Sequence, residues 1–206
     1  MTQPIIYVLD DDVSIGRALT LLLKTHGFKI ETFTRAADFL AAKHPKVPSC
    51  LVLDIRLPQM SGLALQEAMA ARDLFIPIVF ITGHGDIPMS VKAMQAGAID
   101  FLPKPFTEKK LLNAIERALA KNKTQNKAQA EIEKIRRRIK TLSPKELEVF
   151  HFVAKGLMNK QIARKRGTSL QTIKVHRGRV MRKMQAKTVT ELIHLAQKAG
   201  VPSSPK

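Results

Sequence analysis

The sequence predicts two domains of different fold class: an α/β domain with a five-stranded, parallel, doubly wound sheet, and a small all-α domain of four helices. In the first 120 residues, short apolar runs rich in β-formers alternate with longer helical patterns, which is typical of a sheet covered by helices. The last 65 residues carry helix-start signals and no strand pattern. The distribution of charge divides the chain at the same place. Residues 1–120 hold 13 Lys/Arg and 12 Asp/Glu, whereas residues 121–206 hold 22 Lys/Arg and 5 Asp/Glu.

The first domain, residues 1–120, is expected to alternate strands with helices. Its apolar runs lack strict alternation, as expected of strands buried on both faces, and they are Ile5–Leu9, Ile30–Phe33, Cys50–Leu53, Ile76–Ile81 and Ile99–Leu102. The helices predicted after these strands are Ser14–His26, Ala36–Lys43, Leu63–Arg72, Pro88–Ala96 and Glu108–Ala120. Such repeats imply right-handed crossovers and a site beyond the carboxyl ends of the strands.

Residues 121–141 form a polar segment without Pro or Gly, which we expect to be a helical linker continuing the last helix of the first domain. Ala128, Ile132, Ile135 and Ile139 are spaced 4, 3 and 4, so they share one helical face. Two heptads are too short to establish a coiled coil. A solvated helix with one apolar edge is the alternative interpretation.

The second domain, residues 142–200, is predicted from its helix starts. Helix caps are expected at Ser143 and Thr188, each with a Glu three residues later, and at Asn159 and Ser169. Pro144 at the first helical position strengthens the first start, and Gly167 and Gly200 are expected to end helices. Residues 201–206 are expected to be a disordered tail.

Composition narrows the compartment and the class of partner. Cys50 is the single cysteine, so no intrachain disulfide can form, and its apolar run indicates a buried thiol. No apolar segment approaches the roughly 18 residues of a membrane span, and the N-terminus lacks a secretion-signal pattern. We therefore expect a cytoplasmic protein with no membrane part. The net charge of +17 beyond residue 120 indicates a polyanionic partner, although charge alone does not separate DNA from RNA or an anionic membrane.

Acidic residues, a threonine and a lysine lie at the carboxyl ends of four predicted strands: Asp10, Asp11, Asp12, Asp54, Thr82 and Lys104. Acidic side chains from two adjacent strands form a site suited to Mg²⁺. A carboxylate beside such a metal can accept a phosphoryl group, whose oxygens a lysine and a hydroxyl could hold. Singly, these residues could be helix caps or a solvated lysine, but their joint placement favours a phosphoryl-transfer site.

Four segments, VLDDD, LVLDIRLPQMSG, FITGHGD and DFLPKPF, resemble the signature segments of response-regulator receiver domains and together span the first 120 residues. The resemblance implies a flavodoxin-like sheet of strand order 2-1-3-4-5 with Asp54 as phosphoacceptor. It implies that Mg²⁺ is held by Asp54, by Asp11, by Asp10 through water, and by the backbone carbonyl of Arg56. Asp12 lies outside this set and is expected to be a helix-capping or a peripheral acid.

The same resemblance assigns the residues that bind and sense the phosphoryl group. Thr82 and Lys104 would bind phosphoryl oxygens, and the Lys104–Pro105 bond would be cis. Phe101 would be the aromatic switch that turns inward as Thr82 moves. Because Phe101 lacks the hydroxyl of a tyrosine, this switch would act by packing alone.

The pattern from Leu142 to Leu192 resembles the LuxR-type helix-turn-helix domain of FixJ-like regulators. Its recognition helix would be residues 169–184, which would enter the DNA major groove by its N-terminal half. Helical spacing assigns Ile173, Val180 and Met184 to the core. Expected phosphate contacts are Asn159, Lys160, Thr172 and His176. The side chains of Gln171, Lys174, Val175 and Arg179 lie toward the other faces, where Lys174 can donate to guanine and Val175 can touch a thymine methyl. Gly178 lies within this helix, where glycine costs about 1 kcal/mol relative to alanine.

The two resemblances imply a phosphorylation-dependent transcriptional regulator that is not an enzyme beyond its own phosphoryl transfer and dephosphorylation. Implied partners are a sensor histidine kinase, double-stranded DNA, RNA polymerase and, on phosphorylation, a second copy forming a homodimer. Whether phosphorylation would act through dimerisation or through release of the basic domain stays open. The alternatives are a phosphoryl sink whose basic half merely adheres to polyanions, and a basic RNA- or protein-interaction module.

Overall fold

The structure, a computed structural model, describes residues 3–83 and 87–202. It contains two compact units, Met1–Lys127 and Ala128–Lys206, each of which is considered separately below. Residues 84–86 at the end of the FITGHGD segment, and 203–206 of the expected tail, lie outside the described residues. Within the described part of the chain, no helix is both long and apolar enough to span a bilayer.

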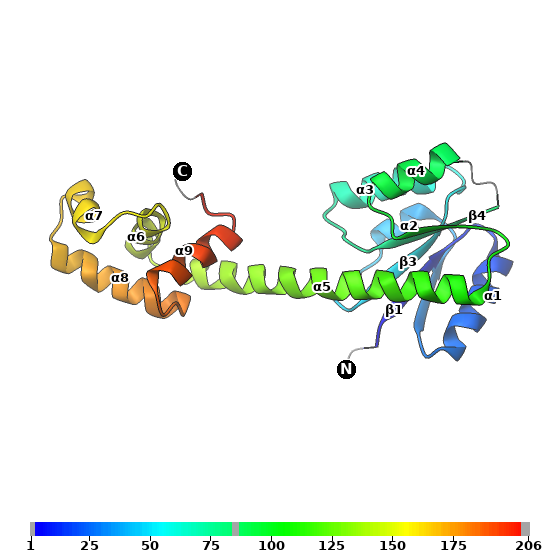
Figure 1. Cartoon of the computed structure of the whole chain (residues 1–206), viewed down its shortest axis with the longest axis horizontal. Coiled ribbons are helices and arrows are strands. Elements are labelled where there is room, and N and C mark those ends of the chain that lie inside the picture. Colours follow the sequence, from blue (N-terminus) through cyan, green and yellow to red (C-terminus); the bar gives the residue numbers. More distant parts are fainter. Residues whose placement is uncertain (1–2, 84–86, 203–206) are drawn as a thin grey trace. The chain divides into compact units, whose positions relative to one another are not determined.

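The first unit is built on a parallel five-stranded sheet of order β2-β1-β3-β4-β5 (Figure 1). The strands are β1 (Ile5–Leu9), β2 (Lys29–Phe33), β3 (Ser49–Asp54), β4 (Ile78–Thr82) and β5 (Asp100–Pro103). The predicted fold class and strand order are confirmed. β4 begins two residues later than expected because Pro77, which has no N–H to donate to the ladder, precedes it.

Helices cover both faces of this sheet. They are α1 (Val13–Thr25), α2 (Ala36–Ala41), α3 (Gly62–Ala71), α4 (Ile87–Gln95) and α5 (Glu108–Lys140). Leu19 and Leu23 of α1 pack with Leu111 and Ile115 of α5 on one face. The apolar side chains of α2, α3 and α4 form a separate cluster on the other (Figure 1). This two-faced burial explains why the β1, β3 and β4 sequences are almost continuously apolar.

Helix α2 ends at Ala41, two residues earlier than predicted. The Nε2 of His44 lies 2.9 Å from the Phe39 carbonyl oxygen and donates to it. That carbonyl is the acceptor that the Lys43 amide would need in a continued α-helix. The His44 side chain therefore replaces the next helical turn. Its ring also packs edge-on against Tyr7, with centroids 5.0 Å apart.

Helix α5 continues through the predicted linker as one helix of 33 residues. Its beginning belongs to the first unit, where Asn122 is 1% exposed. The Asn122 Oδ1 accepts from the Ser49 amide at 3.0 Å, and its Nδ2 donates to the Phe75 carbonyl at 3.0 Å. Asn126, one turn later, donates to Asn122 Oδ1 at 2.8 Å and to the Val47 carbonyl at 3.2 Å. These two asparagines fix this stretch of α5 to the amino end of the sheet.

The second unit contains the end of α5 and helices α6 (Pro144–Ala154), α7 (Asn159–Arg166), α8 (Leu170–Met184) and α9 (Val189–Lys198). The predicted caps Ser143, Ser169 and Thr188 are confirmed, each accepting from the amide three residues later. The predicted cap Asn159 is wrong. Helix α7 is capped at Met158, whose amide donates to Gln161 Oε1 at 2.8 Å, so Asn159 is already inside the helix.

One apolar core holds these helices together. Ile173, Val180 and Met184 are fully buried in it, as their helical spacing predicts, with Val149, Phe150 and Leu192 from α6 and α9. Ile135 of α5 is 2% exposed in the same core and Ile139 packs against it, whereas Ala128 is exposed. Only the last part of the predicted apolar edge of the linker is therefore buried within this unit.

Candidate functional site

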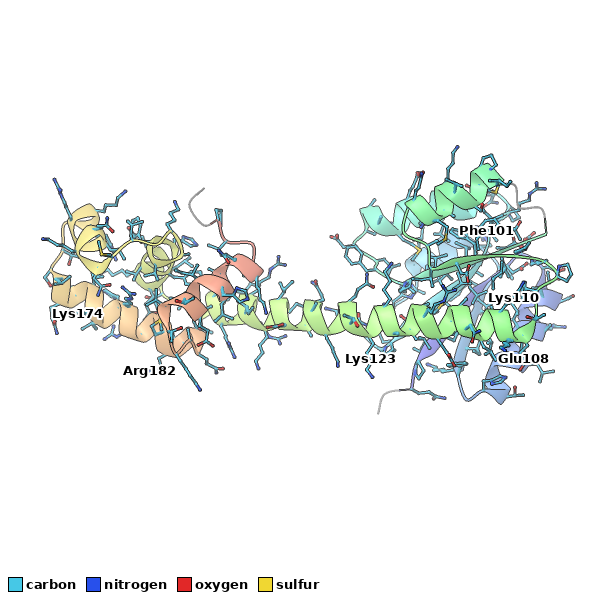
Figure 2. The ribbon with its side chains drawn as sticks, viewed as in Figure 1. Phe101, Glu108, Lys110, Lys123, Lys174 and Arg182 are labelled. Carbon is cyan, nitrogen blue, oxygen red and sulfur yellow. The ribbon has the colours of Figure 1, made fainter. Side chains whose placement is uncertain are left out.

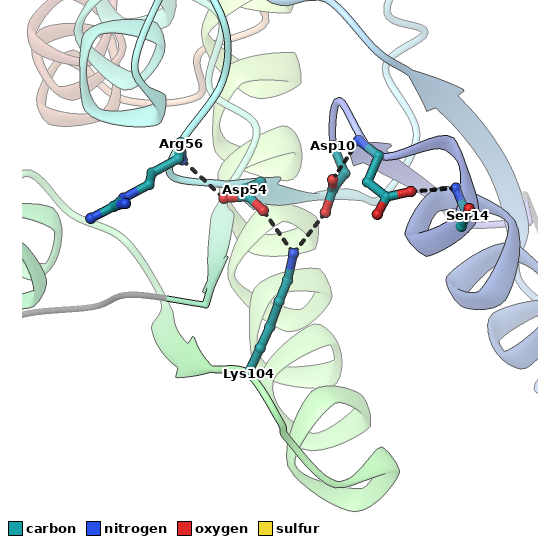
Figure 3. A network of polar contacts seen from close by, with 6 residues as sticks. Asp10, Ser14, Asp54, Arg56 and Lys104 are labelled. Atoms are coloured by element: carbon teal, nitrogen blue, oxygen red, sulfur yellow. Dashed lines mark hydrogen bonds and ion pairs between the residues drawn. The ribbon is translucent and has the colours of Figure 1, made fainter.

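Three charged side chains meet at the carboxyl end of the sheet in the first unit. The Nζ of Lys104, just beyond β5, donates to Asp10 Oδ2 at 2.9 Å and to Asp54 Oδ2 at 2.7 Å (Figure 3). Asp10 is 3% exposed and Asp54 is 8% exposed. The neighbouring positions of β1 and β3 bring the two carboxylates together, and the turn after β5 brings the lysine between them.

Local backbone contacts orient the two carboxylates. Asp10 Oδ1 accepts from the Asp12 amide at 2.9 Å, and Asp54 Oδ1 accepts from the Arg56 amide at 2.9 Å. Asp12 in turn accepts from the Ser14 amide at 2.7 Å and caps α1, as expected. Each buried carboxylate therefore has one oxygen fixed by the backbone and the other directed at Lys104.

Burial sets the electrostatics of this cluster. Desolvation raises the pKa of Asp10 above its ordinary value, and the hydrogen bonds from Lys104 and the Asp12 amide oppose this only in part. For Lys104, desolvation lowers the pKa, but hydrogen bonds to Asp54 and Asp10 outweigh it, so the pKa is raised. The raised pKa of Asp10 therefore reflects mainly the removal of its carboxylate from water, with a smaller contribution from the neighbouring Asp54 carboxylate.

The donor set fits a magnesium ion. Mg²⁺ in proteins uses one or two carboxylates together with water and phosphate oxygens, and the cluster has an excess of negative charge. Asp11 is exposed beside Asp10. Within residues 3–83 and 87–202, no three His, Cys, Asp or Glu side chains are close enough together to hold a metal. The structure thus brings Asp10 and Asp54 together but does not gather Asp11 with them.

The remaining expected residues of this site surround the cluster. Thr82 is fully buried at the end of β4, one position beyond Ile81, which pairs with Asp54. Its carbonyl accepts from the Lys104 amide at 2.6 Å, and the Lys104–Pro105 bond is cis, as expected. Phe101 on β5 is half-buried, with its ring centroid 6.4 Å from that of Phe80.

Gly62, the last residue of the LVLDIRLPQMSG segment, is a further residue of this site. A Cβ at Gly62 would lie 2.9 Å from the Asp54 carbonyl oxygen, 2.9 Å from Phe80 Cε1 and 3.0 Å from Ile55 Cα. The Gly62 amide donates to the Ile55 carbonyl at 2.9 Å. The first turn of α3 therefore lies directly against the backbone that carries Asp54, and only glycine leaves room for it.

Helix α8 of the second unit presents a basic, solvent-facing surface. Lys174, Val175 and Arg179 are exposed on it, Val175 by 45%, and Figure 2 shows Lys174 and Arg182 along this helix. A basic helix with a small apolar side chain is suited to the major groove, where cations meet guanine and apolar groups meet the thymine methyl.

The expected phosphate-contacting residues lie in different environments. Lys160 is exposed, and the Asn159 Oδ1 accepts from Arg177 of α8, which ties α7 to α8. The Thr172 hydroxyl lies 2.8 Å from Ser169 Oγ at the start of α8. His176 is half-buried. Sequence reasoning did not find the Arg177–Asn159 contact, because it joins two helices whose packing only the fold determines.

Comparison with known proteins assigns both units. The description "Response regulator receiver domain" matches residues 6–116, and "Bacterial regulatory proteins, luxR family" matches residues 140–196. Nodulation protein W of Bradyrhizobium diazoefficiens is 43% identical over 98% of this chain and 89% of its own length. The transcriptional regulatory protein FixJ of the same organism is 41% identical, covering 97% of this chain and 98% of its own.

A solved structure of the response regulator StyR is also similar, with 46% identity and a TM-score of 0.79, over 96% of this chain and all of that one. These matches cover both the receiver-like sheet with its Asp10–Lys104–Asp54 cluster and the helical unit with its basic α8. The chain therefore belongs to the two-component response regulators of the FixJ-like type, which combine a receiver domain with a LuxR-type helix-turn-helix domain.

Proposed function

We propose that Asp54 accepts a phosphoryl group from a sensor histidine kinase and that this modification switches DNA binding by the C-terminal domain in the cytoplasm. The observation that supports this most directly is the Lys104 ammonium, 2.7 Å from Asp54 Oδ2 and 2.9 Å from Asp10 Oδ2. The limited exposure of Asp54, with 11% of its side chain accessible, leaves a confined approach for a donor.

In the proposed transfer, a carboxylate oxygen of Asp54 attacks the phosphorus of a phosphohistidine. The phosphorus–nitrogen bond breaks, and its electron pair returns to the imidazole of the kinase. The Arg56 amide, which donates to Asp54 Oδ1, orients the nucleophile. Lys104 moves from pairing with carboxylates to holding a phosphoryl oxygen, and the Thr82 hydroxyl holds another.

Mg²⁺, when bound by Asp10, Asp11, Asp54 and the Arg56 carbonyl, would offset negative charge on the transferring phosphoryl oxygens. Hydrolysis of the resulting acyl phosphate by water would release inorganic phosphate and restore Asp54, so the receiver would catalyse only its own cycle. Phe101 would follow Thr82 inward, because its half-buried ring already packs near Phe80. The receiver face formed by α4, β5 and α5 would then favour homodimerisation or release of the basic domain.

In the proposed DNA complex, α8 lies in the major groove of double-stranded DNA, with Lys174, Val175 and Arg179 toward the bases. Asn159, Lys160, Thr172 and His176 would contact phosphates, which set the register of the protein on the duplex. Transcriptional control would further require contact with RNA polymerase. The exposed basic face of α8 supports the DNA part of this proposal.

Phosphoryl labelling tests the chemistry directly. A small phosphoramidate donor with Mg²⁺ should label the full chain, chelation of the metal should suppress labelling, and Asp54→Asn should abolish it. Label that persists in Asp54→Asn would contradict the assignment of the phosphoacceptor. DNA selection with phosphorylated and unphosphorylated protein should yield a sequence preference that phosphorylation strengthens, and equal binding in both states would contradict the proposed switch.

A further inference from the structure

The last turns of α5 are built into the core of the DNA-binding domain. Ile135 is 2% exposed and shares an apolar cluster with Leu142 and Met184, while Ile139 packs against the same cluster. Met184 is the last residue of α8, the helix proposed to contact bases. The linker helix and the recognition helix therefore meet at their C-terminal ends, within one compact unit.

Two basic side chains at this meeting point form reciprocal caps. Arg138 of α5 donates through Nη1 to the Met184 carbonyl at 3.1 Å, and through Nη2 to the Gln185 side-chain oxygen. Lys183 of α8 donates to the Thr141 carbonyl, just beyond the end of α5, at 2.9 Å. The last carbonyls of a helix lack partners within the helix and carry its negative dipole end, so cations bind there favourably. Each helix thus supplies the cation that caps the other.

Lys183 also connects this junction to α6. Its Nζ lies 2.6 Å from Glu146 Oε2, and the same carboxylate oxygen accepts from the Ser143 amide at 2.8 Å. Glu146 is only 3% exposed. One hydrogen-bonded chain of polar groups consequently joins the end of α5, the start of α6 and the end of α8. Because these groups share hydrogen bonds, we expect the three helix ends to move together.

We propose that Arg138 and Lys183 are positioning residues for the recognition helix: they fix the end of α8 to the linker helix, so that the linker sets the orientation from which α8 contacts DNA. The inference rests on the proposed function in one respect, since it takes α8 as the helix that contacts bases. Because α8 is a continuous helix of 15 residues, a shift at Met184 is carried to Lys174 and Val175 near its other end.

A matched pair of variants tests the proposal in the full chain. Arg138→Met keeps the apolar stem but removes the donors, whereas Arg137→Met removes the same charge from the neighbouring, exposed position. Affinity is measured for selected and for random duplex DNA. Arg138→Met should lower the ratio of the two affinities by about tenfold, as expected for one or two lost hydrogen bonds. Arg137→Met should weaken both affinities equally and leave the ratio unchanged.

Amide hydrogen exchange without DNA gives an independent readout. The Gln185 amide donates to the Arg182 carbonyl at 3.1 Å and the Ala186 amide to the Met181 carbonyl at 3.0 Å, so both report on the end of α8. Arg138→Met should accelerate their exchange, and Arg137→Met should not. Gln185→Ala, which removes only the side-chain acceptor, should give a smaller change in the same direction and serves if Arg138→Met fails to fold.

Each outcome separates this inference from the proposed function. The positioning role is overturned if Arg138→Met changes neither the ratio of the two affinities nor the exchange rates. It is also overturned if Arg137→Met lowers that ratio as much as Arg138→Met does. A lower melting temperature without a change in ratio would assign Arg138 to stability alone and also overturns it. If the wild-type protein shows no sequence preference, base recognition by α8 fails, and with it the orientation on DNA. Exchange then decides only whether Arg138 fixes the end of α8: faster exchange in Arg138→Met supports this part, and unchanged exchange refutes it.

Discussion

Replacing Gly62 with alanine should destabilise the receiver domain and displace Asp54, the proposed phosphoacceptor. The added Cβ would lie 2.9 Å from the Asp54 carbonyl oxygen and 3.0 Å from Ile55 Cα, and both of these are backbone atoms that cannot rotate away. Overpacking of this kind costs about 1–3 kcal/mol. Alanine recovers up to about 1 kcal/mol of that through its better helix propensity. The net expectation is a loss of about 1–2 kcal/mol and slower phosphorylation of Asp54.

The same substitution at Gly178 is the matched control, because a Cβ there meets no atom within 4 Å. Gly178→Ala should stabilise the helix-turn-helix domain by about 1 kcal/mol. The receiver transition can be followed separately, since Tyr7 is the only tyrosine and the chain has no tryptophan. Urea unfolding monitored by tyrosine fluorescence therefore reports the effect of Gly62→Ala on the stability of the receiver. Circular dichroism at 222 nm also reports the unfolding of the helical domain.

Opposite signs for the two substitutions are the essential result. Gly62→Ala with unchanged tyrosine-detected stability and an unchanged phosphorylation rate would refute the argument that close approach to Asp54 requires glycine. A shift of the tyrosine transition in Gly178→Ala would contradict the assignment of fluorescence to the receiver alone.

Three further predictions concern other parts of the chain. Lys174→Ala should cost about 1–3 kcal/mol of specific DNA binding and relax base preference; equal weakening on random DNA would make Lys174 a phosphate contact. Hydrogen bonds from Lys183 and the Ser143 amide lower the pKa of Glu146 from 4.5 to about 2. Because this pKa is lower in the folded state, the stabilisation is complete above about pH 5 and is lost as the pH falls toward 2. Acid unfolding monitored by circular dichroism should therefore be less steep in Glu146→Gln than in the wild type, and equal slopes would argue against this linkage. Asn122→Leu should destabilise the receiver by about 2–4 kcal/mol, because it leaves the Ser49 amide and the Phe75 carbonyl without their hydrogen-bond partner. An unchanged free energy of unfolding in urea would show that these groups find other partners.

Sequence patterns predicted most of the fold because the relevant signals are local. The apolar run Ile5–Leu9 is strand β1 without any change of bounds, and the Ser143–Glu146 capping box starts α6 as expected. The misplaced boundaries have a different cause. The end of α2 depends on the His44 side chain reaching the Phe39 carbonyl, and the start of α7 depends on Gln161 rather than Asn159. At the end of α2 a side-chain donor takes the place of a backbone amide, and at the start of α7 a side-chain oxygen accepts from an amide that has no partner within the helix. Residue propensities register neither contact.

In the candidate site, too, the sequence predicted local features but not the contacts between elements. Strand ends and family motifs were sufficient to predict that Asp10, Asp54 and Lys104 lie together, because carboxyl ends of adjacent parallel strands share one edge. No pattern predicted that Lys104 would bridge both carboxylates, or that Gly62 would lie against the backbone of Asp54. These are contacts between elements, and their geometry is fixed only when the sheet and α3 are packed.

The linker illustrates why such contacts matter for the switch. Its helical character follows from composition, but its attachment depends on hydrogen bonds to other elements, which composition does not register. Asn122 is 1% exposed near one end of the linker, and at the other end Arg138 and Lys183 hold helix ends to each other. Since an unpaired buried polar group costs more than its hydrogen bond contributes, the attachment at the buried Asn122 resists gradual loosening. Under the proposed function, a phosphorylation event at Asp54 would have to act through these two attachments of α5 to change how α8 contacts DNA.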